Sequence, residues 1–194
     1  MPSPSENLSL ARIQDIYPGI EPEPHFSNKT YTGKTVLITG GSRGIGREIA
    51  IFYARAAPGR QSCLYRTRID DVCGKCNNLC RGSFGKDVCL DGIEARLTLG
   101  SASAQCRYPC GSPYIVSKHA LNRLIEYIPI ENPAVKAFTL DPGAIKTDMT
   151  ALNPAAAPYL IDTLALPTAA RLRLTGGRED WLSGRYLSAN WNLD

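Results

Sequence analysis

The sequence lacks a long apolar run, a run of one charge and a recognisable secretion signal. No stretch approaches the roughly 18 consecutive apolar residues of a membrane-spanning helix. Residues 1–7 have neither the basic nor the apolar region of a secretory signal. We therefore expect a cytoplasmic protein with no membrane partner. The formal net charge is only +4, and the basic residues are scattered among acidic ones without a basic run. Nucleic acid is therefore not expected as a partner.

Metal-ligand patterns are also scarce. The chain has only two histidines, His25 and His119, and they lack the spacing of a ligand pair. Its seven cysteines are an odd number, and a reducing cytosol favours free thiols. Four of them lie within residues 67–94 and could offer thiolates to a tetrahedral zinc ion. Because the segment contains a single CxxC pair, Cys73 and Cys76, chance thiols are the favoured interpretation and no metal site is predicted.

The composition is that of a soluble globular protein. The chain has 194 residues, 43% of them hydrophobic and 21% charged, which suits one domain with a sizeable core. Prolines crowd residues 1–33, which predicts an N-terminal extended arm, either lying on the domain or free in solution. Residues 34–194 are then the domain itself. Within it, residues 67–94 form an irregular Cys-rich segment without periodicity.

Alternating strand and helix patterns flank that irregular segment. They predict an α/β fold of the Rossmann type, a doubly wound parallel sheet. Prolines at 129 and 133 are expected to stop the second of the three helix-like stretches. The expected strands are 35–39, 62–66, 96–99, 135–140 and 185–189, and the expected helices are 47–56, 114–128 and 168–173.

A glycine-rich turn separates the first strand from the first helix. In this position backbone N–H groups and a helix N-terminus can face a pyrophosphate. Gly40 permits the tight exit from the strand, Gly44 lets a ligand approach the backbone, and Gly46 allows close packing of the helix. A bare turn is the alternative interpretation. The predicted dinucleotide-binding residues of this turn are Gly40, Ser42, Arg43, Gly44, Ile45 and Gly46.

A second motif places a phenol and an ammonium four residues apart on a helix. Tyr114 and Lys118 would then share one face. A fixed cation beside a phenol favours the phenolate, which makes a better base near neutral pH. Ser101 lies just after a candidate strand, where its hydroxyl could meet the phenol. The alternatives are a solvated Tyr/Lys face and a serine that only caps local backbone.

These motifs together resemble the short-chain dehydrogenase/reductase family, and in particular its fungal members. The matching segments are TGGSRGIG at 39–46, YIVSK at 114–118, DPGAIKT at 141–147 and LSGRYLSANW at 182–191, together with Ser101. The resemblance implies that Tyr114 is the general acid/base, that Ser101 polarises the substrate oxygen, and that Lys118 holds the nicotinamide ribose. It also implies that Ile145 and Thr147 contact the nicotinamide end.

The same resemblance implies a nicotinamide cofactor, and charge indicates which one. Arg43 in the turn, with Arg66 or Arg68 at the end of the second strand, favours the 2′-phosphate of NADP over NAD, although NAD stays open. Ordinary surface charge is the alternative role of these arginines. The expected partner is a small carbonyl or alcohol substrate, and a homo-oligomer is allowed.

The chain is too short between the two motifs for the complete family fold. Only 29 residues separate Arg66 from Arg96, where the family has further strands, helices and an Asn-Asn-Ala-Gly motif. We therefore expect a sheet with fewer strands than the family norm, because of an internal deletion. The leading interpretation is an NADP-dependent oxidoreductase. The rival is a truncated, non-catalytic relative that binds or dimerises through residues 114–128.

Overall fold

The computed structural model describes residues 12–34, 36–39, 41–57, 64–66 and 95–194. By internal contacts the chain divides into two compact units, one comprising Met1–Pro22 with Ala95–Asp194 and the other Glu23–Glu94. The domain bounds expected from the sequence, 1–33 and 34–194, stay a prediction. The Cys-rich segment 67–94, with its alternative zinc ligands, lies outside the described residues.

The first unit is built on a three-stranded parallel sheet. Its strands are β3 (Ala95–Leu99), β4 (Lys136–Asp141) and β5 (Arg185–Ser188), in the order β3-β4-β5. Leu99 pairs with Leu140, and Asp141 pairs with Ser188. Because the strands are parallel and in this register, their carboxyl ends meet at one edge of the sheet.

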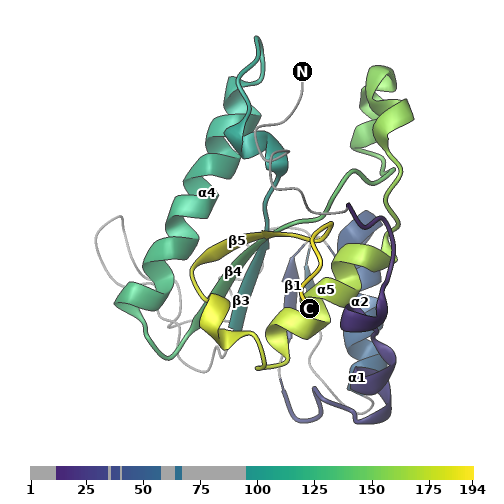
Figure 1. The fold of residues 1–194 in the computed structure, drawn as a ribbon, viewed down its shortest axis with the longest axis vertical. Coiled ribbons are helices and arrows are strands. Elements are labelled where there is room, and N and C mark those ends of the chain that lie inside the picture. Colours follow the sequence, from purple (N-terminus) through teal and green to yellow (C-terminus); the bar gives the residue numbers. More distant parts are fainter. Residues whose placement is uncertain (1–11, 35, 40, 58–63, 67–94) are drawn as a thin grey trace. The chain divides into compact units, whose positions relative to one another are not determined.

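Two long helices cover this sheet, one on each face (Figure 1). Helix α4 (Ser112–Glu131) turns Ile125 and Ile128 inward. Helix α5 (Ala165–Thr175) buries almost its entire length, including Leu166, Leu172 and Leu174. The central strand β4 is correspondingly apolar, with Phe138 and Leu140 fully buried. The remaining turns of this unit are the 3-10 helices η2 (Pro18–Ile20), η3 (Ala102–Gln105), η4 (Thr150–Leu152), η5 (Pro154–Tyr159) and η6 (Asp180–Leu182).

Helix α4 runs past the proline that was expected to end it. It continues through Pro129 to Glu131, so the predicted stop at residue 128 was wrong. A proline lacks the N–H that would bond the carbonyl four residues earlier, and its ring crowds that carbonyl, but Pro129 lies in the last turn of α4 and its fixed φ is compatible with helical geometry. The Asn132 N–H still donates to the Ile128 carbonyl at 2.8 Å, which closes the last turn.

The second unit contains one βαβ arrangement. Strands β1 (Leu37–Thr39) and β2 (Leu64–Arg66) are parallel, and α2 (Gly44–Ala56) connects them in the sequence. Helix α2 buries Ile49, Phe52 and Tyr53. The rings of Phe52 and Tyr53 pack edge-on against Phe26 and Tyr31.

Residues 12–33 are more ordered than an extended arm. They contain η2 in the first unit and α1 (Glu23–Ser27) in the second. Both short helices carry a proline within their first turn, Pro18 and Pro24, where the missing N–H is not needed for an intrahelical bond. Pro18–Ile20 and Glu23–Ser27 are therefore helical where extended chain was expected.

The α/β class with parallel strands is confirmed, and the sheets of two and three strands that the described residues form are consistent with an incomplete sheet. Each expected strand and helix outside residues 67–94 has a counterpart within a few residues of its predicted bounds. None of the helices in the described part of the chain is long and apolar enough to cross a membrane.

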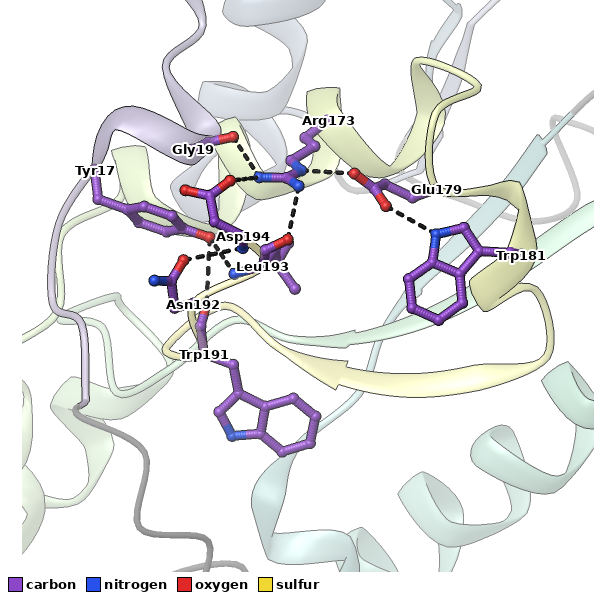
Figure 2. Close-up of polar contacts among 9 residues, drawn as sticks. All are labelled: Tyr17, Gly19, Arg173, Glu179, Trp181, Trp191, Asn192, Leu193 and Asp194. Carbon is purple, nitrogen blue, oxygen red and sulfur yellow. Dashed lines mark hydrogen bonds and ion pairs between the residues drawn. The ribbon is translucent and has the colours of Figure 1, made fainter.

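Arg173 on α5 binds residues from both ends of the first unit (Figure 2). The Arg173 guanidinium donates to the Gly19 carbonyl at 2.6 Å and to the Leu193 carbonyl at 2.7 Å. It also forms ion pairs with Glu179 at 2.8 Å and Asp194 at 2.7 Å. The Arg173 side chain is only 18% exposed and Glu179 only 9%, so water screens their pair poorly.

We predict that Arg173→Ala destabilises the fold by about 2–4 kcal/mol, because it leaves the Glu179 carboxylate buried without its cation. Arg123→Ala is the matched control, since it removes a pair with Glu126 whose side chains are 66% and 46% exposed. Its expected cost is below about 1 kcal/mol. Urea unfolding of both variants measures the loss of unfolding free energy, and equal losses would contradict the role given to Arg173.

Candidate active site

Tyr114 and Lys118 lie one turn apart near the start of α4, as the sequence predicted. The Lys118 Nζ atom is 5.7 Å from the centroid of the Tyr114 ring. It also donates a 2.7 Å hydrogen bond to the carbonyl of Leu99, the last residue of β3. Burial lowers the pKa of the Lys118 ammonium. The Tyr114 ring is 40% exposed, so a ligand can reach the phenol.

Ser101 lies two residues after the end of β3 and is the N-cap residue of η3. Its Oγ accepts a 3.2 Å hydrogen bond from the Ser103 N–H, so the capping role considered for this serine is present. An accepting hydroxyl keeps its own proton for donation. Helix η3 packs against α4, which brings the Ser101 segment to the helix that carries Tyr114. Capping and a catalytic role are therefore compatible.

Asp141 anchors that segment from the end of β4. Its carboxylate accepts from the Ala102 N–H at 3.1 Å and from the Ser188 hydroxyl at 3.1 Å. Burial raises the pKa of the Asp141 carboxyl, opposed by these hydrogen bonds, by one from the Gly143 backbone and by the charge of Arg12. Most of the hydrogen-bond donors to this buried carboxylate are neutral groups. The carboxylate holds them in place, because losing one of these hydrogen bonds would leave a buried polar group without a partner.

The loop after β4 carries the two residues expected to contact nicotinamide. Ile145 is buried at 3% exposure and forms an isolated parallel bridge with Asp162. Thr147 is interlocked with Thr150, whose hydroxyl receives the Thr147 N–H at 2.8 Å. Gly143 starts this loop with φ +86°, a conformation that glycine adopts without strain. These contacts constrain the shape of the loop.

The glycine turn occupies the start of α2 in the second unit. Gly41 and Ser42 form the turn, Arg43 is the N-cap, and Gly44 begins the helix with φ +53°. No side-chain hydrogen bond from Arg43 caps the helix. An uncapped helix start presents backbone N–H groups and the positive end of the helix dipole, which suit an anion.

Several predicted residues are only partly described. Gly40 lies outside the described residues, and Arg66 is placed only as the last residue of β2. Ile45 and Gly46 lie in the first turn of α2. Within the described part of the chain, no group of three or more His, Cys, Asp and Glu side chains could hold a metal ion.

Sequence reasoning missed the residues that support the site. Asp141 was seen only as part of a turn motif, although its place at a strand end is a usable signal. Asp162, Asn190 and Arg12 meet near the same loop from distant parts of the chain. No local pattern marks them, because their contacts exist only after folding.

The described residues define an α/β protein with parallel strands, and comparison with known proteins narrows the class. No family model matches the chain. It is 39% identical over 85 residues to the short chain dehydrogenase andI of Emericella variicolor, covering 42% of this chain and 29% of that protein. It is 27% identical over 235 positions to a short chain dehydrogenase/reductase of Claviceps purpurea, covering 84% and 80%.

Solved structures show the same fold. A short chain dehydrogenase from Salmonella enterica matches with a TM-score of 0.65 and 16% identity, over 83% of this chain and 97% of that one. One from Burkholderia cenocepacia in complex with NADP matches with a TM-score of 0.62 and 18% identity, over 82% and 97%. The resemblance to the short-chain dehydrogenase/reductase family is confirmed by two fungal proteins of that name, and the solved structures confirm the fold.

The chain is shorter than the relatives it matches. It spans less than a third of the Emericella variicolor protein. The 235-position alignment with the Claviceps purpurea protein is longer than the 194 residues of this chain, so that relative contains residues that this chain lacks. This agrees with an internal deletion.

We predict that the stability advantage of the wild-type chain over Asp141→Asn falls as pH rises. A carboxyl whose pKa is raised by folding contributes its full stability below the unfolded pKa of about 3.9, and that contribution is lost as the pH rises through the folded pKa. A tenfold difference between the folded and unfolded ionisation constants is worth about 1.4 kcal/mol.

Thermal unfolding of both proteins between pH 4 and pH 8 measures this difference. Asp180→Asn, which neutralises an exposed aspartate, corrects for the loss of one charge. A wild-type advantage that grows with pH would contradict the assignment.

Proposed function

We propose that this chain is an NADP-dependent oxidoreductase of the short-chain dehydrogenase/reductase type that transfers hydride between NADP(H) and a small carbonyl or alcohol. The observation that carries the proposal is the Tyr114/Lys118 pair at the carboxyl edge of β3. Lys118 is held there by the Leu99 carbonyl, and Ser101 follows two residues later. This arrangement provides an acid/base, a cation and a hydroxyl donor in adjoining elements.

Each unit offers groups of the kind that one part of a nicotinamide dinucleotide requires. The uncapped start of α2 offers N–H groups to a pyrophosphate. Lys118 and the loop containing Ile145 and Thr147 would hold the nicotinamide end, with the Lys118 ammonium available to ribose hydroxyls. When bound, the nicotinamide supplies or accepts the hydride.

The side chains of this chain then manage the proton and the substrate oxygen. In the reducing direction, Tyr114 donates its phenolic proton to the substrate oxygen as the carbonyl carbon receives hydride, which balances carbonyl, hydride and proton to an alcohol. Ser101 donates a hydrogen bond to the same oxygen. The Lys118 ammonium stabilises the phenolate left on Tyr114. In the oxidising direction each transfer reverses.

Charge supports NADP over NAD. Arg43 lies exposed at the N-cap of α2, and Arg66 ends β2 in the same unit. A 2′-phosphate favours such cations, whereas a free ribose favours a carboxylate. The structural neighbour with NADP bound is consistent with this preference. We also propose a cytoplasmic location and leave the homo-oligomer open.

One observation favours the rival, non-catalytic function. Helix α4 exposes several large apolar side chains, a surface that a partner could cover. They are Val116 at 63%, Leu124 at 54%, Tyr127 at 49% and Ile130 at 72% exposure. A binding or dimerisation partner through α4 is therefore the second candidate function.

We predict that Tyr114→Phe lowers kcat with NADPH and a panel of small carbonyls by roughly a hundredfold or more, because the acid/base group is lost. The dissociation constant for NADPH should change by less than about threefold, since no cofactor charge is removed. Tyr127→Phe, on the same helix, is the matched control and should keep wild-type turnover.

Turnover is followed by NADPH absorbance and binding by its fluorescence. Unchanged kcat in Tyr114→Phe would reject the catalytic role. A wild-type chain that oxidises NADPH with none of the carbonyls, yet associates with itself in sedimentation, would favour the rival.

We predict that Arg43→Gln weakens NADPH binding by roughly tenfold, about 1.4 kcal/mol, while NADH binding changes by less than about twofold. The reason is the loss of one charge-assisted hydrogen bond to the 2′-phosphate. Arg47→Gln removes a neighbouring exposed charge from α2 and serves as the control. Fluorescence titration measures both cofactors, and an equal loss for NADPH and NADH would contradict the assignment.

A further inference from the structure

We propose that Asp162 is a positioning residue for the candidate active site, fixing the loop after β4 through a buried hydrogen-bond chain that reaches the Ser101 segment. The inference rests on the proposed function for its catalytic meaning. Asp162 belongs to none of the motifs that carry the family resemblance, and it lies between η5 and α5.

The Asp162 side chain is completely buried and satisfied by three donors. Its carboxylate accepts from the Ala144 N–H at 2.6 Å, from Arg12 at 2.8 Å and from the Asn190 side-chain amide at 3.0 Å. The Asp162 N–H in turn donates to the Ala144 carbonyl at 3.1 Å. Asp162 therefore binds both the N–H and the carbonyl of Ala144, the residue before Ile145.

The same network continues to Ser101. The Asn190 N–H donates to the Ser188 Oγ at 3.3 Å, and the Ser188 hydroxyl donates to Asp141 at 3.1 Å. Asp141 receives the N–H of Ala102, the residue after Ser101. The buried path thus joins the two loops that follow β3 and β4, which carry the proposed hydroxyl donor and cofactor contacts.

Steric constraints make the arrangement specific. A Cβ atom on Gly143 would lie 2.6 Å from the Asp162 Oδ2 atom and 3.0 Å from the Asn190 Oδ1 atom. The backbone at Gly143 therefore lies so close to the Asp162 carboxylate that no side chain would fit between them. A carboxylate presents only acceptors here, whereas an asparagine would turn an NH2 group toward one of three donors.

The positive charge that pairs with the Asp162 carboxylate comes from a segment distant in the sequence. Arg12 is the cation paired with Asp162, and the neighbouring Ile13 carbonyl accepts from the Asn190 amide at 2.6 Å. Residues 12 and 13 therefore complete the enclosure of a carboxylate that would otherwise be buried with neutral donors alone.

Hydrogen exchange of the cofactor-free chain tests the proposal directly. In Asp162→Asn, exchange of the peptide covering residues 143–147 should accelerate about tenfold or more. Glu179→Gln is the matched control, because it also alters a buried carboxylate paired with an arginine, at the far end of α5. It should leave that peptide unchanged even if it lowers the melting temperature as much.

Kinetics separate positioning from a general loss of stability. Asp162→Asn should raise the KM for NADPH about tenfold with kcat within about threefold, because Asp162 binds the loop with the proposed cofactor contacts directly, whereas the Ser101 segment keeps its own bond to Asp141. Glu179→Gln should change neither. If Asp162→Asn does not fold, Ser188→Ala removes one hydroxyl from the same path and should accelerate exchange in residues 101–105.

The outcomes are distinguishable. Unchanged exchange in residues 143–147, or equal acceleration in Glu179→Gln, overturns the positioning role. Unchanged KM despite faster exchange also overturns it. A wild-type chain that neither binds NADPH nor turns over rejects the proposed function instead, and the exchange data then still decide whether Asp162 holds the loop.

Discussion

The common carboxyl edge of β3, β4 and β5 is the constraint on which the candidate site depends. Parallel pairing in this register ends the three strands together, at Leu99, Asp141 and Ser188. The Leu99 carbonyl then receives Lys118, and Asp141 receives the Ala102 N–H and the Ser188 hydroxyl. Because buried polar groups must be satisfied, these contacts determine where Ser101 and the loop after β4 can lie.

Local patterns in the sequence were sufficient for the elements and for the Tyr/Lys pair. The β-branched and apolar runs indicated the strands, and the four-residue spacing placed Tyr114 and Lys118 on one helix. Ser101 was correctly placed after a strand, and its cap was one of the two roles considered. These features depend on residues close together in the chain, so a single sequence carries them.

Other features depend on tertiary contacts and could not be predicted. Asp162, Arg12 and Asn190 are separated by up to 178 positions in the sequence, and only folding brings them together. Pro129 was misjudged because helix packing tolerates one missing N–H near the last turn. The helix at Glu23–Ser27 was missed because a proline in a first turn is permitted. In each case, tertiary contacts or the position within a helix outweighed the preference of the residue itself.

The described residues thus include contacts that support the proposed chemistry. Asp141 and Asp162 hold the two loops, while Lys118 is fixed from the end of β3. The central claim is that this chain binds a nicotinamide dinucleotide. Calorimetric titration of the wild-type chain with NADPH tests it most directly. We predict saturable binding at one cofactor per chain, and the absence of saturable binding to folded protein would contradict the claim.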